Sequence, residues 1–395
     1  MKIKVGIIIN SIDWNGGINY FKNLIFCNKF TKNNIEFVII SSNEKLKKIF
    51  KGTKVYITPL LKKFSFFWFL RKILNNFLFY KYDLILTNFI KKKKISIITH
   101  NSNIHDLGVS KFIKHIVWIP DFQHLQFKQY YTKKNINYLN RLFEKLITNS
   151  DGVIVSSKHA LTQLRDNFHH NKKNFILNNV SGLGLNFKIK IKQKKRLIKK
   201  YKLKKKWFLI PNQFWQHKNH ILVLNALNYL KQNNTNNIFI ICCGSTIDYR
   251  NKLYFKKVLE QIKKNKLEND IKILGDIPYK DVMELMRYSI AVINPSKYEG
   301  WSTSVEESIA MGKKIILSQI KVHIEQQVNS GANNNFYFFK LNDYKTLANY
   351  LKKLFEEFSE KHEEHNINLA KRKNKKRIKI FIQNYNKILN NVKSI

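Results

Sequence analysis

The sequence predicts an α/β fold with two consecutive parallel sheets, each flanked by helices. Short apolar runs alternate with longer helical patterns, and this alternation restarts in the second half of the chain. With 395 residues, of which 44% are hydrophobic and 13% aromatic, the chain exceeds one ordinary core, so two domains are expected. Two tandem doubly wound domains would face a central cleft and bind ligands at the carboxyl ends of their strands.

Apolar runs of strand length mark the candidate strands, and their continuity indicates burial on both faces of a sheet. The first half contains runs at 4–9, 36–40, 54–57, 83–87, 96–99, 115–119 and 152–156. The second half contains runs at 207–210, 238–243, 271–274, 290–293, 314–317 and 336–339.

A glycine-containing segment, 181–184, precedes a lysine-rich stretch that ends at Lys206. This composition predicts a linker followed by a surface helix, and we place the domain boundary near residue 190. The expected organisation is a Rossmann-like domain over 1–190, a second one over 191–375, and a basic C-terminal helix over 376–395. A return of this helix to the first domain is a further expectation.

Positive charge is abundant: 72 Lys and Arg residues against 26 Asp and Glu give a formal net charge of +46. A surplus of this size attracts polyanions such as nucleic acids or anionic lipid headgroups. The lysines are spread through the chain together with Asn, Ile, Phe and Tyr, which also fits a codon bias without any binding role. No nucleic-acid-binding signature accompanies the charge, so no nucleic-acid partner is expected.

The segment 60–80 interleaves aromatic and basic residues, and two interpretations stay open. It can form a core helix of the first domain with a basic outer stripe, or it can lie in the interface of an anionic membrane. The residues concerned are Phe64, Phe66, Phe67, Trp68, Phe69, Leu70, Arg71, Lys72, Phe77, Phe79 and Tyr80. Co-sedimentation of the protein with anionic vesicles is expected under the second interpretation.

Cysteine use and the N-terminal residues indicate the compartment. The adjacent Cys242 and Cys243 lie in an apolar run, which predicts buried thiols in a reducing compartment and no zinc site or disulfide scaffold. Residues 1–6 lack a signal-peptide pattern, and no uncharged apolar run reaches about 18 residues. We therefore expect a cytoplasmic protein, with the inner face of the cytoplasmic membrane as a further expected location.

The most informative segment is 298–312, in which Glu299 precedes Glu307 by eight positions. Glu299 lies in a loop of small residues after an apolar run, and Glu307 lies in the first turns of a predicted helix. Such a strand, loop and helix N-terminus form an anion site, because free backbone N–H groups and the positive helix end favour phosphate. Two carboxylates beside it can accept hydrogen bonds from sugar hydroxyls. The segment therefore suggests a nucleotide-sugar site.

Glu299 and Glu307, with Pro295 and Ser296 before and Gly312 after, resemble the E-x7-E signature of retaining glycosyltransferases of family 4, of the bacterial surface-polysaccharide type. Other segments agree with that family in their order, at 16–17, 119–124, 155–157, 210–220, 243–245 and 273–278. The resemblance spans nearly the whole chain. It implies a GT-B fold, with an acceptor-side N-terminal domain and a donor-binding C-terminal domain.

The resemblance also implies roles for individual residues. Glu299 contacts the transferred sugar, Glu307 contacts the ribose hydroxyls, and Lys218 carries positive charge to the diphosphate. Glu306 is expected to point away from the site or to pair with a lysine. The other implied donor-binding positions are Gly16, Gly17, Asn212, Gln213, Gly244, Ile277, Gly300, Trp301, Ser302 and Thr303.

On the acceptor side the resemblance favours Asp121 and His124 as catalytic residues, with His105 and Asp106 as a rival pair. No two aspartates stand two positions apart, so we expect no Asp-x-Asp metal site and no metal cofactor. Family members commonly carry an arginine where this chain has Asn212 and its neighbour Gln213, which puts a two-cation phosphate clamp in doubt.

The resemblance implies a metal-independent retaining hexosyltransferase. It would move a hexose from a nucleotide-diphosphate sugar to a hydroxyl of a glycan or lipid-linked acceptor in surface-polysaccharide biosynthesis, such as lipopolysaccharide, O-antigen or capsule. Two alternatives stay open. One is a polyanion- or membrane-binding protein that uses a GT-B scaffold without catalysis. The other is a sugar-nucleotide epimerase or a phosphorylase on the same fold.

Overall fold

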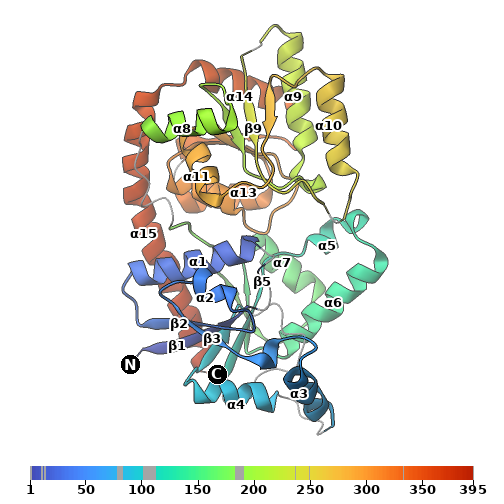
Figure 1. Cartoon of the computed structure of the whole chain (residues 1–395), viewed down its shortest axis with the longest axis vertical. Coiled ribbons are helices and arrows are strands. Elements are labelled where there is room, and N and C mark those ends of the chain that lie inside the picture. The colour runs from blue at the N-terminus through green and yellow to red at the C-terminus, as the bar shows by residue number, and fades with distance from the viewer. Residues whose placement is uncertain are drawn as a thin grey trace. The chain divides into compact units, whose positions relative to one another are not determined.

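The computed structural model describes residues 2–9, 12, 15–77, 83–100, 113–182, 191–235, 237–248, 250–331 and 333–394. The chain divides into two compact units. Unit 1 consists of Met1–Asn179 together with Ile378–Ile395, and unit 2 consists of Val180–Arg377. Each unit contains one parallel sheet with helices beside it (Figure 1). The boundary expected near residue 190 lies outside the described residues.

The sheet of unit 1 has seven strands in the order β3-β2-β1-β4-β5-β6-β7, and all neighbouring strands are parallel. Its central strands are buried on both faces, which accounts for their continuous apolar sequences. The strands are β1 (Ile3–Ile8), β2 (Ile35–Ser41), β3 (Lys54–Ile57), β4 (Ile97–Thr99), β5 (Lys114–Ile119), β6 (Gly152–Val155) and β7 (Lys173–Ile176).

Helices cover this sheet through apolar contacts. One cluster joins strands β1, β2 and β4 to α4, and another joins β5 and β6 to α6 and α7. The helices of unit 1 are α1 (Asn15–Phe30), α2 (Lys45–Ile49), α3 (Phe66–Phe77), α4 (Leu84–Lys92), α5 (Gln123–Gln126), α6 (Lys133–Thr148) and α7 (Lys158–Asn167), with 3-10 turns η1 (Pro59–Leu61) and η2 (Lys128–Tyr130).

The strand predicted at 83–87 is wrong, because these residues begin helix α4. The side chain of Asp83 accepts a hydrogen bond from the N–H of Leu86 at 2.9 Å and thereby caps the helix. Leu86 and Ile90 are buried at the i, i+4 spacing of one helix face. A short apolar run does not distinguish the two structures by itself. Strand β7 was not predicted.

The sheet of unit 2 has six parallel strands in the order β10-β9-β8-β11-β12-β13. All six lie where the sequence predicts strands, with bounds shifted by one or two residues. They are β8 (Phe208–Ile210), β9 (Ile240–Cys242), β10 (Ile271–Ile273), β11 (Ala291–Asn294), β12 (Lys314–Ser318) and β13 (Phe336–Phe339). Cys242 and Cys243 are buried free thiols, as predicted.

Apolar residues of α9, α10 and α14 pack on one face of this sheet, and those of α8 and α11 pack on the other (Figure 1). A smaller cluster joins α12 to β12 and β13. The helices of unit 2 are α8 (Ile191–Tyr201), α9 (His220–Gln232), α10 (Tyr254–Lys264), α11 (Tyr279–Tyr288), α12 (Thr303–Ala310), α13 (Lys321–Ser330) and α14 (Tyr344–Glu356), with 3-10 turns η4 (Gln216–Lys218) and η5 (Asn333–Asn335).

The basic C-terminal segment is helical, as predicted, and α15 extends over Glu360–Lys393. Its first part, up to Arg377, belongs to unit 2 and its last part belongs to unit 1. Within unit 1 the buried Tyr385 stacks on Phe37 of β2 at a centroid distance of 5.7 Å. Among the described helices, none is both long and apolar enough to cross a membrane.

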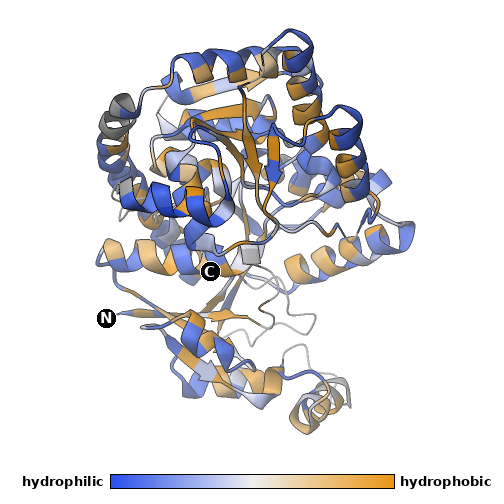
Figure 2. Cartoon of the chain, turned by 45° about the horizontal axis from the view of Figure 1, so that its top comes forward, coloured by the Kyte–Doolittle hydropathy of each residue, from blue (hydrophilic) through white to orange (hydrophobic). Residues whose placement is uncertain are grey.

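The interpretation of 60–80 as a core helix is wrong for the described part of this segment. Figure 2 shows α3 as a largely hydrophobic helix, and Phe64 and Phe66 are 78% and 74% exposed. Arg71, expected on a basic stripe, is instead buried, and its Nε lies 3.1 Å from Asp83 Oδ2. Phe79 and Tyr80 lie outside the described residues. The other exposed apolar side chains of α3 are Phe67, Phe69, Leu70, Ile73 and Leu74.

Candidate active site

The carboxyl ends of the strands of unit 2 carry most of the predicted donor residues. In a parallel sheet these ends lie at one edge, where loops and helix N-termini gather and ligands bind. Strand β8 leads into Asn212 and then Lys218, β9 leads into Gly244, and β11 leads into Glu299. We call this edge the donor edge.

An ion pair between Lys218 and Glu299 lies at the donor edge. Lys218 Nζ lies 2.7 Å from Glu299 Oε1, and the two side chains are only 14% and 9% exposed. Burial raises the pKa of Glu299, but the Lys218 ammonium opposes this effect and holds the pKa below its ordinary value. Glu299 is therefore ionised at neutral pH. The structure brings together the two residues for which the sequence predicts the sugar and diphosphate contacts.

Asn294, the last residue of β11, links the loops of the donor edge. Its Nδ2 donates to Ser302 Oγ at 2.8 Å and to Glu299 Oε1 at 3.3 Å. Its Oδ1 accepts from Asn212 Nδ2 at 3.1 Å and from Ser296 Oγ at 2.6 Å. Sequence reasoning missed Asn294. Its signal was an amide at the end of a wholly apolar strand, a position that is costly unless the amide is hydrogen-bonded.

Glu307 lies on α12, and its Oε1 accepts a hydrogen bond from the hydroxyl of Tyr279. Glu307 is buried and Tyr279 is half-buried. Burial raises the pKa of Glu307 to about 7. The same burial, with the Glu307 charge, raises the pKa of Tyr279, so this residue stays a hydrogen-bond donor. Tyr279 was not predicted, because it begins α11 and adjoins Glu307 only in the folded chain.

Glu306 faces away from Tyr279 and forms a separate buried cluster. Its Oε2 lies 2.7 Å from Arg377 NH2, and its Oε1 accepts from Gln326 Nε2 at 3.1 Å. The sequence predicted either a position off the site or a lysine partner. The partner is an arginine from α15, which stands 71 positions later in the chain.

Gly244 brings two loops of the donor edge into close contact. Its φ is +137°, and a Cβ built there would lie 2.8 Å from the backbone of Asn212 and Gln213. Any other residue would be strained and would separate the loops. Its N–H donates to the carbonyl of Gly275 at 2.9 Å. Ile277, two residues further on, is half-buried and packs beside this region.

The loop 300–303 ends at the N-terminus of α12. Gly300 and Trp301 are half-buried, Ser302 is buried, and Thr303 is the first helical residue. Ser302 occupies the N-cap position, but its side chain makes no capping hydrogen bond. The backbone N–H groups in the first turn of α12 are therefore not capped by the Ser302 side chain and can donate hydrogen bonds to an anion. The positive end of the helix dipole also favours an anion there.

The predicted residues of unit 1 lie at the corresponding edge of its own sheet. Gly16 and Gly17 form part of the first turn of α1, with Gly16 exposed and Gly17 buried. Asp121 follows β5, and its Oδ1 accepts from the N–H of Gln123 at 3.0 Å. His124 Nε2 is 2.9 Å from Asn140 Oδ1, and burial lowers the pKa of His124. The rival pair, His105 and Asp106, lies outside the described residues.

Two buried histidines, one directly after β4 and one in the first turn of α13, were also missed. His100 follows β4 with a φ of +54°, and its Nε2 and Nδ1 lie 2.9 Å from Tyr20 Oη and Thr99 Oγ1. His323 follows β12, and its Nδ1 donates to the carbonyl of Ser318 at 2.8 Å. The remaining nitrogen of His323 is buried and has no hydrogen-bond partner among the described residues.

A second cation lies beside His217, the residue before Lys218. Arg250, in the loop after β9, places NH2 3.4 Å from Nδ1 of His217 and stacks over Trp215 at 4.7 Å. Its Nε also lies 3.1 Å from Asp248 Oδ1. The described residues contain no group of three or more His, Cys, Asp or Glu side chains arranged to hold a metal ion.

Residues 191–376 match the family model described as Glycosyl transferases group 1. This segment belongs to that family. The match coincides with unit 2 and its donor edge, and it confirms the family resemblance inferred from Glu299 and Glu307. No curated protein matches this chain by sequence.

Solved structures resemble this chain over its whole length. A glycosyltransferase from Rickettsia africae ESF-5 is 18% identical, with a TM-score of 0.65 over 100% of this chain and 98% of that chain. Anabaena Alr3699/HepE in complex with UDP and glucose is 14% identical, with a TM-score of 0.69 over 100% of both chains. The lipopolysaccharide outer core galactosyltransferase WaaB is 15% identical, with a TM-score of 0.57 over 96% and 99%. At these identities the likeness shows the fold, which is the predicted GT-B fold.

Proposed function

We propose that this protein is a glycosyltransferase that transfers a hexose, with retained anomeric configuration and without a metal ion, from a nucleotide-diphosphate sugar to a hydroxyl of a glycan or lipid-linked acceptor in surface-polysaccharide biosynthesis. The observation that carries the proposal is the buried Lys218–Glu299 ion pair at the donor edge of a group 1 glycosyltransferase domain. The solved relative from Anabaena, bound to UDP and glucose, favours a UDP-sugar as donor.

The ion pair prepares Lys218 and Glu299 for their proposed roles. In the absence of donor each side chain neutralises the other, so neither buried charge is left uncompensated. When the donor enters, its diphosphate oxygens take hydrogen bonds from Lys218 and from the N-terminus of α12. Glu299 then accepts hydrogen bonds from hydroxyls of the hexose, while Asn294 holds it in place from β11.

Glu307 and Tyr279 are proposed to hold the nucleoside. The second oxygen of Glu307 accepts from the ribose hydroxyls, because Tyr279 donates only to Oε1. Gly244 keeps the Asn212 loop against the β9 loop, so that the base and diphosphate meet a fixed backbone surface. Gln213, Ile277, Gly300, Trp301, Ser302 and Thr303 complete the proposed donor residues of unit 2.

The transfer requires stabilisation of negative charge on the departing diphosphate. The bond from the anomeric carbon to the β-phosphate oxygen breaks, and a bond from that carbon to the acceptor oxygen forms on the same face of the sugar. The acceptor proton passes to the departing diphosphate. Fixed cations and backbone donors contribute most to such a step, since they need no reorganisation as the charge develops. Lys218 is the principal cation, and Arg250 is the proposed replacement for the family's second one.

The acceptor is proposed to bind unit 1, where Asp121 and His124 orient the hydroxyl. Gly16 and Gly17, in the first turn of α1, are proposed as donor-binding residues of this unit. Because Asp121 Oδ1 already accepts from a backbone N–H, its other oxygen is the one proposed to receive the acceptor hydroxyl. The polysaccharide pathway rests on the family and on the solved lipopolysaccharide galactosyltransferase.

Helix α3 is proposed to hold unit 1 against an anionic membrane. Its Phe66, Phe67 and Phe69 side chains are exposed, and Lys62 and Lys63 beside them are exposed as well. Apolar side chains flanked by lysines suit the boundary between acyl chains and anionic headgroups. Arg71 ties the helix to Asp83, so its exposed face has a fixed orientation in the unit.

The membrane proposal is tested by sedimentation with vesicles of 30% phosphatidylserine in low salt. The wild-type protein should co-sediment, and a Phe66→Ser/Phe69→Ser variant should remain in the supernatant. Val328→Ser, which removes a 70% exposed apolar side chain of unit 2, is the matched control and should bind as the wild type does. Equal binding by all three proteins would show that charge alone attracts the vesicles and would remove the role of α3.

The donor proposal is tested by calorimetric titration with UDP-, GDP-, ADP- and CMP-sugars in the presence of EDTA, followed by a transfer assay. We expect UDP-hexose binding in EDTA, about 100-fold or greater loss of transfer in Glu299→Ala, and much weaker binding in Lys218→Ala. Lys256→Ala, an exposed lysine of α10, is the control.

Three outcomes would overturn the assignment. Full transfer by a folded Glu299→Ala variant would remove the proposed site. Tight, salt-sensitive nucleic-acid binding without nucleotide-sugar binding would favour the polyanion-binding protein. A reaction that needs only water or phosphate as second substrate would favour the epimerase or phosphorylase.

A further inference from the structure

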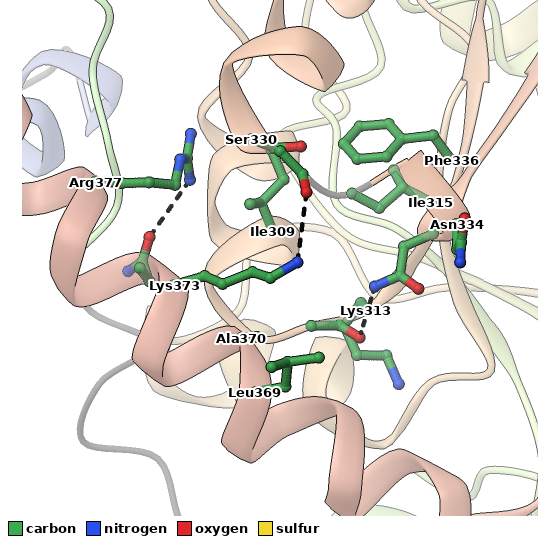
Figure 3. A pocket seen from close by; sticks show the side chains of 14 residues that line it. Ile309, Lys313, Ile315, Ser330, Asn334, Phe336, Leu369, Ala370, Lys373 and Arg377 are labelled. Carbon is green, nitrogen blue, oxygen red and sulfur yellow. Dashed lines mark hydrogen bonds between the residues drawn. The ribbon is translucent and has the colours of Figure 1, made fainter.

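A pocket of about 380 Å³ opens at the opposite edge of the unit 2 sheet (Figure 3). It lies where β12 and β13 begin, between the end of α13 and the part of α15 that belongs to unit 2. Residues of the donor edge such as Lys218, Glu299 and Glu307 are not part of its lining. The pocket is large enough for a small organic ligand.

Three cations line this pocket: Lys313, Lys373 and Arg377. The lining contains no Asp or Glu residue. Lys313 is buried and its Nζ donates to the carbonyl of Ser289 at 2.5 Å. Lys373 Nζ is 3.4 Å from the carbonyl of Gly331, and in the described part of the chain it forms no ion pair. The pocket is therefore electropositive, and an anion satisfies its charge.

The remaining lining combines neutral polar groups with an apolar wall. Ile309, Ile315, Phe336 and Leu369 form the wall on the sheet and α15 sides (Figure 3). Amide and hydroxyl groups, which can both donate to and accept from sugar hydroxyls, stand around the cations. These groups belong to Ser330, Asn334, Asn335 and Asn374. Apolar contact for a sugar ring, amides for its hydroxyls and ammonium groups for a phosphate together fit a sugar phosphate.

A chain of buried contacts connects this pocket to the donor edge. Arg377 NH2 lies 2.7 Å from Glu306 Oε2. Glu306 Oε1 accepts from Gln326 Nε2 at 3.1 Å, and the same Nε2 donates to the carbonyl of Ser302 at 2.9 Å. Ser302 is the N-cap residue of α12, and Glu307 follows Glu306 directly on that helix. All five residues lie within unit 2.

We propose that the pocket lined by Lys313, Lys373 and Arg377 is a second ligand site, which binds a sugar phosphate and thereby weakens donor binding at the other edge of the sheet. The phosphate takes hydrogen bonds from Lys373 and from Arg377. Arg377 then shares its charge between the phosphate and Glu306, which is buried and depends on it. The hydrogen bonds that link Glu306, Gln326 and Ser302 then weaken. As a result, the backbone N–H groups at the N-terminus of α12 lose their fixed arrangement. The coupling, but not the binding itself, rests on the proposed donor site.

Binding is tested by calorimetric titration of the full chain with glucose 1-phosphate, inorganic phosphate and glucose. We expect glucose 1-phosphate to bind more tightly than inorganic phosphate, and glucose not to bind measurably. Lys373→Glu and Asn334→Asp, both at exposed positions, place negative charge in the pocket and should weaken binding about tenfold or more. Lys376→Glu and Asn342→Asp make the same changes at exposed positions outside the lining and should bind as the wild type does.

The donor site also binds phosphates, so a Lys218→Ala variant separates the two sites. A folded Lys218→Ala variant, checked by circular dichroism, should lose any glucose 1-phosphate binding at the donor edge and keep the binding that Lys373→Glu weakens. Loss of all binding in folded Lys218→Ala, or equal loss in Lys373→Glu and Lys376→Glu, would overturn the second site. These titrations do not require UDP-sugar binding, so they stand even where the proposed function fails.

The coupling is tested by titrating UDP-glucose into the protein with and without saturating glucose 1-phosphate. We expect a several-fold weaker affinity for UDP-glucose in the wild type, within the range of ordinary allosteric coupling, and no change in Lys373→Glu. An equal weakening in Lys373→Glu would show direct competition at the donor edge and would overturn the coupling. An unchanged affinity in the wild type would overturn it as well.

Discussion

The carboxyl edges of the two sheets differ in how they bury polar side chains. The donor edge of unit 2 holds a charged pair, Lys218 and Glu299, inside a network of amides and hydroxyls. The edge of unit 1 holds a neutral cluster instead, in which His100 contacts Tyr20 and Tyr20 stacks on Trp118 at 4.3 Å. Burial lowers the pKa of His100 to about 3, so this cluster stays uncharged at neutral pH.

This difference indicates what each edge is prepared to bind. A buried ion pair contributes little net stability, because desolvation offsets most of its attraction. Such a pair is useful where an incoming charged ligand exchanges partners with it. A neutral aromatic cluster gives a rigid surface against which an uncharged group can pack. The comparison therefore agrees with a diphosphate at unit 2 and a hydroxylated acceptor at unit 1.

Removing one member of the charged pair should have the largest effect on stability. Lys218→Ala leaves Glu299 buried without its cation, and we expect a loss of about 3–5 kcal/mol in the free energy of unfolding. The double variant Lys218→Ala/Glu299→Ala should recover part of that loss. Urea unfolding followed by circular dichroism measures both. Lys231→Ala, at a lysine whose side chain is 40% exposed and lies 3.8 Å from Asp270, should cost less than about 1 kcal/mol. Equal costs for the two lysines would contradict the importance of burial at the donor edge.

Glu307 should make unit 2 less stable as the pH rises. Its folded pKa of about 7 lies above the ordinary value of 4.5. The folded state therefore holds this proton more tightly, and the resulting stability is present below pH 4.5 and lost as the pH rises through 7. The loss is on the order of 3 kcal/mol. Glu307→Gln should remove this pH dependence, as measured by urea unfolding between pH 4.5 and 8. An unchanged slope in the variant would mean that Glu307 ionises freely in the folded chain.

His100 should make unit 1 less stable as the pH falls, which is the opposite of the effect of Glu307 on unit 2. Its folded pKa of about 3 lies below the ordinary 6.5, so its contribution is fully present above pH 6.5 and is lost as the pH falls. By pH 5 the loss is about 2 kcal/mol. Asparagine tolerates the φ of +54° at this position. The His100→Asn variant should therefore fold, and its stability should fall less steeply as the pH is lowered. Amide exchange of β4 and β5 between pH 5 and 7 is the measurement. A slope equal to that of the wild type would assign the acid sensitivity to other histidines.

Tyr20→Phe should have the smallest effect in this series. The substitution removes the hydroxyl that contacts His100 but keeps the ring stacked on Trp118. We expect a loss of about 1–2 kcal/mol, because a buried imidazole nitrogen is left without that partner. Thermal unfolding measures this loss of stability. The control is Tyr138→Phe, which changes a 55% exposed tyrosine of α6. A loss as large as that of Lys218→Ala would erase the contrast between the two edges.

The sequence by itself determined the two-sheet fold and most of its strands. Parallel strands buried on both faces must be continuous apolar runs, so every strand of unit 2 was identifiable. The exception at 83–87 arose because an apolar run of that length fits either a strand or a helix. The capping by Asp83 and its ion pair with Arg71 decide for the helix, and neither contact has a signature in the run itself.

The motif also predicts Lys218, Glu299 and Glu307 as site residues, because a loop between a strand and a helix fixes their place from local sequence alone. Only the tertiary structure supplied Asn294 and Tyr279 as neighbours of Glu299 and Glu307, and Arg377 as the partner of Glu306. These residues come from separate elements that meet when the sheet and its helices assemble. Local patterns record which face of an element is buried, whereas the partner of a buried polar group depends on packing between elements far apart in the chain.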